Sequence, residues 1–177
     1  MLLYQAISFE LNSRVRSLVK VLSGILLLLF ASKITIPFYP VPFTLQTLTL
    51  LLLPFLCGKK LSLLATSIWV LIGCIGVPVF SGTMSGMQYI LGPTGGYIIG
   101  LLVASFMHSL IDINLFVKRI YILSLLIIFF FGVSWLSHFI EGKSAIIYGF
   151  LIFIPSELIK ALAFFKLYNS YIKPTSS

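Results

Sequence analysis

Two ionisable residues, Glu157 and Lys160, lie within a long apolar segment near the C-terminal end of the chain. A charge inside a membrane costs at least about 2.5 to 3.5 kcal/mol on insertion scales, so such residues need partners and generally have a function. Their three-residue spacing places both on one face of a helix, where they can neutralise each other. The pair is either a structural ion pair that fixes this helix in a bundle or the polar floor of a ligand pocket or ion path. We predict the second.

The composition indicates that these residues belong to an integral membrane protein. Hydrophobic residues make up 59% of the 177 and charged residues only 9%, whereas an ordinary globular domain has about 25% charged residues. The net charge of +8 comes from short basic clusters between apolar runs, which is a topology signal rather than a nucleic-acid-binding pattern. Cys57 and Cys74 lack the spacing of a disulfide framework or zinc site. We therefore predict membrane lipid as a partner and no nucleic-acid partner, no metal and no cofactor.

The apolar runs predict an all-α fold, a single membrane domain over residues 1–177 with six transmembrane helices. A spanning helix needs roughly 20 mainly apolar residues. The first run also resembles a signal peptide, but the chain stays apolar after it, so we interpret it as the first helix, preceded by a cytoplasmic lead-in at 1–16. Gly96 and Gly100 predict close packing of the fourth helix against a neighbour. The expected helices cover about residues 17–36, 43–57, 61–76, 94–110, 120–140 and 145–168.

The distribution of basic residues predicts that both termini are cytoplasmic. Of the twelve Lys and Arg residues, nine then lie inside, Lys33 and Lys143 lie outside, and Lys160 lies within a span. Such a bias toward the cytoplasmic side is typical of membrane proteins. This orientation places a proline-rich segment at 37–42 and an uncharged, Gly-rich stretch at 77–93 on the outer face. Together they can form a lid over an outer pocket.

Other motifs are weaker candidates for chemistry. Residues 92–96 have the glycines of a phosphate loop but lack its Gly-Lys-Ser/Thr ending. His138 and Glu141 have a spacing that can bind a metal, but no third ligand accompanies them. Ser81 and Ser85 have no histidine at a matching depth that would activate a nucleophile. These patterns do not support an enzyme.

Four motifs, taken together, resemble the BioY family of biotin transporters. They are IPFYPVPFTLQT at 36–47, IGVPVF at 75–80, LGPTGGY at 91–97 and PSELIKA at 155–161, and the resemblance spans about residues 20 to 165. It implies the six-helix fold of a substrate-binding (S) component of an energy-coupling factor (ECF) transporter. It also implies high-affinity biotin capture at the cytoplasmic membrane. The implied partners are a transmembrane coupling subunit and two cytoplasmic ATPases, although some members are thought to act alone.

The resemblance also implies a biotin site. Glu157 can accept the ureido N–H groups, and Lys160 can donate to the ureido carbonyl or pair with Glu157. Trp69 and Tyr39 can cover the ring faces, and the valerate carboxylate can bind at the start of the fourth helix, where the helix dipole favours an anion. The predicted substrate-binding residues are Glu157, Lys160, Trp69, Tyr39, Gln46, Thr44, Phe80, Tyr89, Gly95, Gly96 and Tyr97.

The sequence departs from the family pattern at two places. Glu157 stands where the family usually has Asp, so the carboxylate reaches one methylene further. Ser17 and Val21 stand near the position of an Ala-xxx-Ala motif that docks the coupling subunit in many members. Two alternatives stay open: an S component for another vitamin, and a small polytopic membrane enzyme such as an acyl or phosphatidyl transferase, which the polar outer loops and Glu141 suggest.

Overall fold

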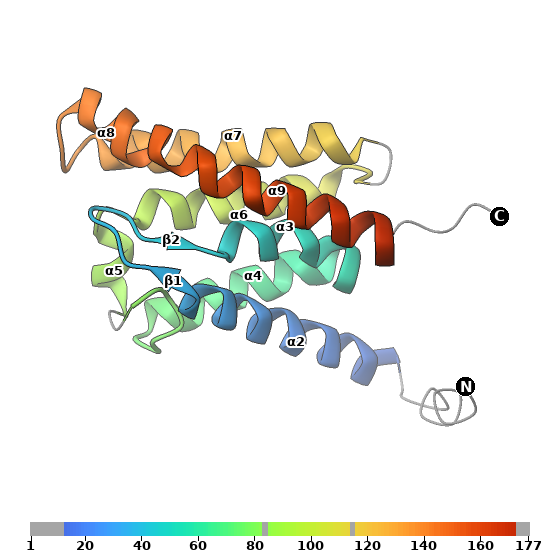
Figure 1. Cartoon of the computed structure of the whole chain (residues 1–177). Coiled ribbons are helices and arrows are strands. Elements are labelled where there is room, and N and C mark those ends of the chain that lie inside the picture. Colours follow the sequence, from blue (N-terminus) through green and yellow to red (C-terminus); the bar gives the residue numbers. More distant parts are fainter. Residues whose placement is uncertain (1–12, 83–84, 114–115, 173–177) are drawn as a thin grey trace.

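The apolar runs form long helices that lie side by side in one bundle (Figure 1), as a computed structural model shows for residues 13–82, 85–113 and 116–172. An α-helix satisfies all its backbone hydrogen bonds within the segment, which hydrocarbon requires. The longer helices are α2 (Ser13–Lys33), α3 (Gln46–Cys57), α4 (Lys59–Cys74), α6 (Gly95–Leu110), α7 (Val117–Leu136), α8 (Gly142–Gly149) and α9 (Ile154–Leu167). The shorter elements are strands β1 (Thr35–Ile36) and β2 (Phe43–Thr44), helix α5 (Met87–Leu91), a 3₁₀ turn (Leu151–Phe153) and a π-helical turn (Tyr168–Ile172).

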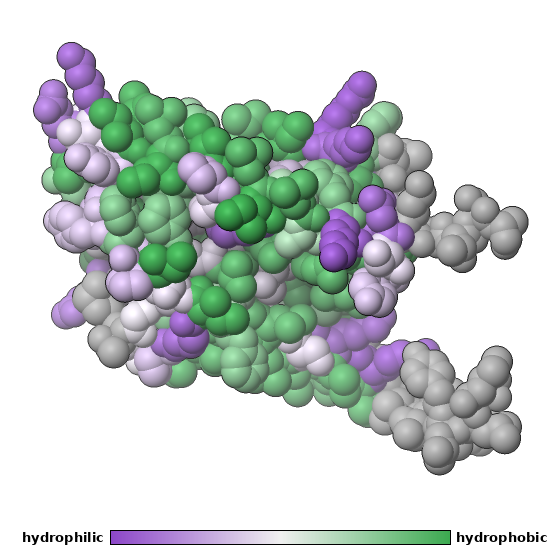
Figure 2. All heavy atoms as spheres, in the orientation of Figure 1, coloured by the Kyte–Doolittle hydropathy of each residue, from purple (hydrophilic) through white to green (hydrophobic). Residues whose placement is uncertain are grey.

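The outer surface of the bundle is apolar. The segments Ser13–Lys33, Val117–Leu136 and Gly142–Ile172 are long and apolar enough to cross a membrane, and α3 and α6 are shorter apolar helices. Apolar side chains cover much of the visible face between hydrophilic groups at its two ends (Figure 2). Large side chains on α2, such as Leu18, Leu22 and Phe30, point outward and are more than half exposed. The prediction of an α-helical membrane protein is therefore confirmed.

Several element boundaries differ from those predicted. The last predicted helix, 145–168, is divided into α8, the 3₁₀ turn and α9. Pro155 lies in the first turn of α9, where the N–H that it lacks would have no partner within the helix. The stretch 77–93, expected to be a loop, contains α5. Residues 13–16 of the predicted lead-in begin α2, whereas its residues 1–12 lie outside the described residues.

The proline-rich segment is the turn of a two-stranded antiparallel hairpin. Thr35 of β1 pairs with Thr44 of β2, and Ile36 pairs with Phe43. Figure 1 places this hairpin, α5 and the connection between α7 and α8 at one end of the bundle. The described chain begins, at α2, and ends, after α9, at the opposite end. The elements that carry the predicted lid thus converge at one end.

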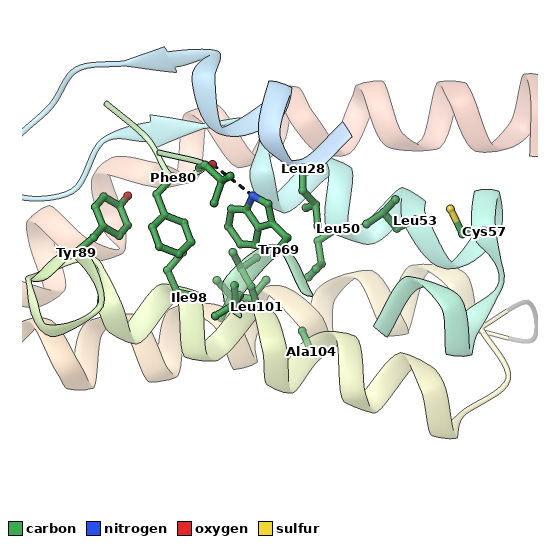
Figure 3. Close-up of a cluster of buried hydrophobic side chains, with 13 residues drawn as sticks. Leu28, Leu50, Leu53, Cys57, Trp69, Phe80, Tyr89, Ile98, Leu101 and Ala104 are labelled. Atoms are coloured by element: carbon green, nitrogen blue, oxygen red, sulfur yellow. Dashed lines mark hydrogen bonds between the residues drawn. The ribbon is translucent and has the colours of Figure 1, made fainter. Parts of the chain in front are cut away.

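Close helix packing in the centre depends on glycine. A methyl group at Gly100 of α6 would lie 2.7 Å from the Cα atom of Ile128 on α7, and one at Gly132 of α7 would overlap the Tyr97 ring. Small residues at such positions allow two helix backbones to approach. Around this contact, a buried cluster extends between α2, α3, α4 and α6 and includes Trp69 and Leu101 (Figure 3).

Candidate functional site

Glu157 and Lys160 form a buried ion pair in the first turns of α9. The Lys160 Nζ atom lies 2.5 Å from the Glu157 Oε1 atom, and the two residues are only 6% and 7% exposed. The three-residue spacing on one helix brings the two side chains together, as geometry requires. Glu157 also lies in the first turn of the helix, where the macrodipole favours a negative charge.

Thr47 on α3, across the bundle from α9, is hydrogen-bonded to both members of the pair. The Lys160 ammonium donates to the Thr47 hydroxyl oxygen at 3.0 Å, and this hydroxyl lies 3.2 Å from each oxygen of the Glu157 carboxylate. The hydroxyl can therefore accept from the lysine and donate to the carboxylate at once. Buried charges are tolerated where they are paired and hydrogen-bonded. We call these three residues the floor cluster.

A second polar group lies beside the floor cluster and ties the hairpin to α2 and α3. The Gln46 amide donates to the Ser32 hydroxyl at 2.8 Å, and the Ser32 hydroxyl donates to the Leu28 carbonyl at 2.6 Å. The Thr44 hydroxyl donates to the Gln46 carbonyl oxygen at 3.1 Å. The nitrogen and the oxygen of the Gln46 amide are thus both hydrogen-bonded, so the side chain is held in position at the edge of the floor cluster.

A small cavity of about 40 Å³ lies against the floor cluster. The hairpin, the segment before α6 and helices α3, α6, α7 and α9 all contribute to its wall. Six of the predicted substrate-binding residues line it: Thr44, Gln46, Tyr89, Tyr97, Glu157 and Lys160. The other polar lining residues are Thr47, Ser81 and Thr94, and the apolar walls are Val41, Pro42, Ile98, Leu101, Ile128, Phe129 and Phe153.

Three predicted aromatic residues are not in the cavity wall. Tyr39 is 81% exposed at the turn of the hairpin. Trp69 is fully buried, and its indole N–H donates to the Val79 carbonyl at 3.3 Å. Phe80 lies edge-on to Trp69 and stacks on Tyr89 with ring centroids 4.7 Å apart (Figure 3). Trp69 and Phe80 therefore support Tyr89, which does reach the cavity.

Gly95 and Gly96, the other two predicted residues outside the cavity wall, serve packing at the start of α6. A methyl group at Gly95 would overlap the Ile90 carbonyl, and one at Gly96 would overlap the Trp135 side chain. The Trp135 indole N–H donates to the Gly92 carbonyl at 2.9 Å. These contacts fix the start of α6 against α5 and α7.

Sequence reasoning did not select Thr47, Ser81 or Thr94. Thr47 ends the first family-like motif and lies three residues after Thr44 within the predicted helix 43–57, so an i, i+3 polar spacing was available as a signal. The Ser81 and Tyr89 hydroxyls lie 2.6 Å apart, a contact between two segments of the Gly-rich stretch. That contact depends on the loop conformation and has no sequence signature.

The arrangement suits a small ligand with polar ends and an apolar body. Such ligands bind in cavities with mostly apolar walls and a few placed polar groups. Here the polar groups are an anion, a cation and several hydroxyls, and the walls are aliphatic and aromatic. Within the described ranges, no three His, Cys, Asp or Glu side chains gather as a metal site.

Comparison with known proteins identifies relatives of this chain. A probable biotin transporter BioY of Rickettsia prowazekii is 37% identical over 167 residues, covering 92% of this chain and 86% of that protein. The biotin transporter BioY of Thermotoga maritima is 36% identical over 150 residues, covering 82% and 89%. A crystal structure of the S component for biotin from an ECF-type ABC transporter is 27% identical, with a TM-score of 0.75 and coverage of 89% of this chain and 90% of that one. The family model for the BioY family matches residues 5–175, and the chain belongs to this family.

Proposed function

We propose that this chain takes up biotin as the substrate-binding S component of an ECF-type transporter or as a solitary transporter. The floor cluster at the base of an apolar-walled cavity is the observation that supports this most strongly. The relatives are biotin transporters, and the similar solved structure is an S component for biotin. The chain is accordingly a transport protein and not an enzyme.

The floor cluster matches the ureido ring of biotin. This ring has two N–H donors and one carbonyl acceptor, so Glu157 accepts from the N–H groups and Lys160 donates to the carbonyl, while the Thr47 hydroxyl holds both charged groups in position. A ligand that is held by both a donor and an acceptor is distinguished from analogues that lack either group, because the unmatched partner would stay buried without a hydrogen bond. Thr44 and Gln46 are further polar contacts in this proposal.

The other end of biotin reaches the opposite side of the cavity. The thioether ring and aliphatic chain pack on Ile98, Leu101 and Phe153. The valerate carboxylate lies near the start of α6, where the Thr94 hydroxyl and the helix dipole favour an anion.

Biotin binding requires the cavity to widen. Sites for small molecules have volumes of about 300 to 1,000 Å³, whereas this cavity has about 40 Å³. Val41 and Pro42 of the hairpin turn line the cavity, as do Ser81 and Tyr89 of the Gly-rich stretch. We therefore propose that segment 37–42 and the described parts of the Gly-rich stretch, 77–82 and 85–93, move apart to admit biotin and close over it afterwards.

Six transmembrane spans with both termini in the cytoplasm are part of the proposal. Helices α2, α3, α4, α6 and α7 supply five spans, and α8 with the turn and α9 supplies the sixth. Basic residues support the orientation. Helix α4 begins with Lys59 and Lys60, and α7 has Lys118 and Arg119 in its first turn; both helices begin at the end of the bundle where the described chain begins and ends. The hairpin and α5 then face the outside of the cytoplasmic membrane.

The coupling subunit and two ATPases are the proposed partners. Docking of the coupling subunit on α2 is consistent with the apolar side chains that this helix exposes, although Ser17 with Val21 is the nearest match in this helix to an Ala-xxx-Ala docking motif. Biotin uptake by cells that express this chain alone, compared with cells that also express the coupling and ATPase subunits, distinguishes solitary from ECF-dependent transport.

Direct binding tests the proposal as a whole. Purified protein in nanodiscs is expected to bind biotin and to prefer it over other vitamins in a competition panel with labelled biotin. Desthiobiotin, which keeps the ureido ring, is expected to compete, and a biotin analogue without the ureido N–H groups is not. Absence of biotin binding by folded wild-type protein would overturn the proposal.

A further inference from the structure

Helices α7 and α9 leave an apolar groove between them on the side of the bundle. Its volume is about 420 Å³, far larger than the 40 Å³ cavity at the floor cluster. Leu125 and Phe129 of α7 form one wall, and Ile154 and Ala161 of α9 form the other. The groove is the larger of the two spaces, although the predicted polar residues converge on the smaller one.

The groove ends against Glu157. Glu157 and Phe129 line both the groove and the cavity at the floor cluster, so these two side chains separate one space from the other. The groove surface is almost entirely apolar, so apolar groups in the groove keep the Glu157–Lys160 pair in a low-dielectric site, whereas water there would weaken the pairing. Whatever fills the groove is therefore part of the wall of the ligand site.

Hydrocarbon surrounds the mouth of the groove. Ile122 and Leu126 of α7 and Leu158 of α9 line it, and each is between 56% and 61% exposed. These helices belong to segments that are long and apolar enough to span a membrane. The solvent at this depth is then lipid, whose acyl chains are as apolar as the groove walls.

The lining favours an acyl chain over a helix of a partner protein. Membrane helices pack closely where small residues let their backbones approach. Ala161 is the single small residue among the groove's lining residues, and the others are large aliphatic, aromatic or charged side chains. A flexible chain one carbon wide can follow such a surface, whereas a helix would contact only its rim.

Basic residues at one end of the groove indicate that the bound lipid has an anionic headgroup. Lys118, near the start of α7, lines the groove, and Arg119 follows it with its guanidinium 5.2 Å from the centre of the Phe116 ring. The start of α7, which carries both cations, lies at the end of the bundle where the described chain begins and ends. Basic residues at a membrane surface attract anionic headgroups.

We propose that the groove between α7 and α9 binds an acyl chain of an anionic phospholipid, whose headgroup phosphate lies on Lys118. The bound chain closes the back of the site behind Glu157. Lipid composition then affects ligand binding without any lipid contact to the ligand itself. This last consequence rests on the proposed biotin site, but the lipid site does not.

Native mass spectrometry of the full chain with added lipid tests the lipid site. Wild-type protein is expected to retain phosphatidylglycerol in preference to phosphatidylcholine with the same acyl chains. Lys118→Gln should lower phosphatidylglycerol affinity about fivefold, the effect of one basic residue near an anionic surface. Lys60→Gln removes an exposed cation at the same end of the bundle that does not line the groove, and it should leave the affinity unchanged.

A second pair of variants tests the position of the acyl chain. Ala161→Phe fills the groove and should abolish retention of both lipids, whereas Ala163→Phe, on another face of α9, should not. Equal lipid retention by Ala161→Phe and wild-type protein would overturn the proposal, as would a chain dimer that forms in place of the lipid complex and is lost in Ala161→Phe. Lys118→Gln, at an exposed position, keeps the proposal testable if Ala161→Phe fails to fold. The experiment contains no biotin, so its outcome is independent of the proposed transport function.

Discussion

The Lys160 ammonium on α9 donates a 3.0 Å hydrogen bond to the Thr47 hydroxyl on α3, joining residues that are 113 positions apart in the chain. This contact makes the floor of the cavity a tertiary feature. The two charges share one helix and would meet in α9 alone, but their third partner arrives only when α3 packs beside α9. The floor cluster therefore links the proposed biotin site to the assembly of the bundle.

The first prediction removes the Thr47 hydroxyl without changing the side-chain volume. Thr47→Val leaves Lys160 and Glu157 each without one hydrogen bond, and a bond to a charged group contributes about 1.5 to 3 kcal/mol. Biotin affinity should fall by about tenfold or more. Isothermal titration calorimetry in nanodiscs measures this, with Thr49→Val as a control on the same helix, outside the cavity wall. Unchanged affinity in Thr47→Val would show that the hydroxyl does not contribute to the site.

The second prediction separates the structural from the ligand-binding role of the ion pair. Glu157→Gln and Lys160→Met each leave one buried charge unpaired, which should destabilise the protein by about 3 to 5 kcal/mol. The double variant Glu157→Gln/Lys160→Met has no unpaired charge, so its stability should recover while biotin binding stays lost. Thermal unfolding and biotin titration of all three variants form a double-mutant cycle. Biotin binding by the double variant at wild-type affinity would contradict the proposed roles.

The pairing of Glu157 with Lys160 was predictable, because a three-residue spacing places both side chains on one helix face and an unpaired charge within a membrane is costly. The contact with Thr47 was not, since it depends on how α3 packs against α9. Trp69 illustrates the same limit: its residue type suits a ring-stacking contact, but sequence does not say which face of α4 points to the cavity, and the structure places it in the core. Tyr39 lies at the exposed turn of a hairpin whose geometry is set by strand pairing.

The division of the last predicted helix had a partial signal. A continuous apolar run favours one helix, and Pro155 indicates a helix start or a kink. The structure uses Pro155 within the first turn of α9 and ends α8 at Gly149, whose carbonyl accepts from the Tyr97 hydroxyl at 2.7 Å. Tyr97 belongs to α6, so the hydrogen bond to Gly149 depends on how α6 packs against α8. The periodicity of residues 145–168 alone therefore does not show that the helix is interrupted after Gly149.

The third prediction concerns the close approach of α6 and α7. Alanine is favoured over glycine within a helix by about 0.5 to 1 kcal/mol, so propensity alone would make Gly100→Ala stabilising. Its methyl group, however, would lie 2.7 Å from the Ile128 Cα atom and 2.9 Å from the Ile128 carbonyl oxygen. Backbone cannot move aside as a side chain does, so the two helices must separate, and overpacking of this kind typically costs about 1 to 3 kcal/mol.

Gly142→Ala is the matched control, because a methyl group there meets no atom within 4 Å. Thermal unfolding in detergent should show a lower midpoint for Gly100→Ala and an unchanged or higher midpoint for Gly142→Ala. Equal unfolding midpoints for the two variants would show that α6 and α7 can lie further apart than in this structure without loss of stability.

The last prediction concerns the lid. Lys33, at the end of α2, donates to the Phe80 carbonyl and the Gly82 carbonyl, each at 2.9 Å, and so holds the Gly-rich stretch against the bundle. The Phe80 ring stacks on Tyr89, which lines the cavity. Lys33→Met removes both hydrogen bonds but leaves the floor cluster intact. We expect the lid to open more often, and bound biotin to dissociate faster, by about tenfold for a loss near 1.4 kcal/mol.

Stopped-flow release of a fluorescent biotin derivative measures this rate. Lys143→Met removes an exposed basic residue at the start of α8, which lies at the same end of the bundle, and should leave release unchanged. Lys33→Arg keeps a hydrogen-bond donor and should restore most of the wild-type rate. The association rate distinguishes the lid from the floor: a looser lid speeds release and does not slow association, because the polar groups that recognise the ligand are untouched. Slower association with unchanged release in Lys33→Met would mean that Lys33 attracts the anionic ligand and does not hold the lid closed.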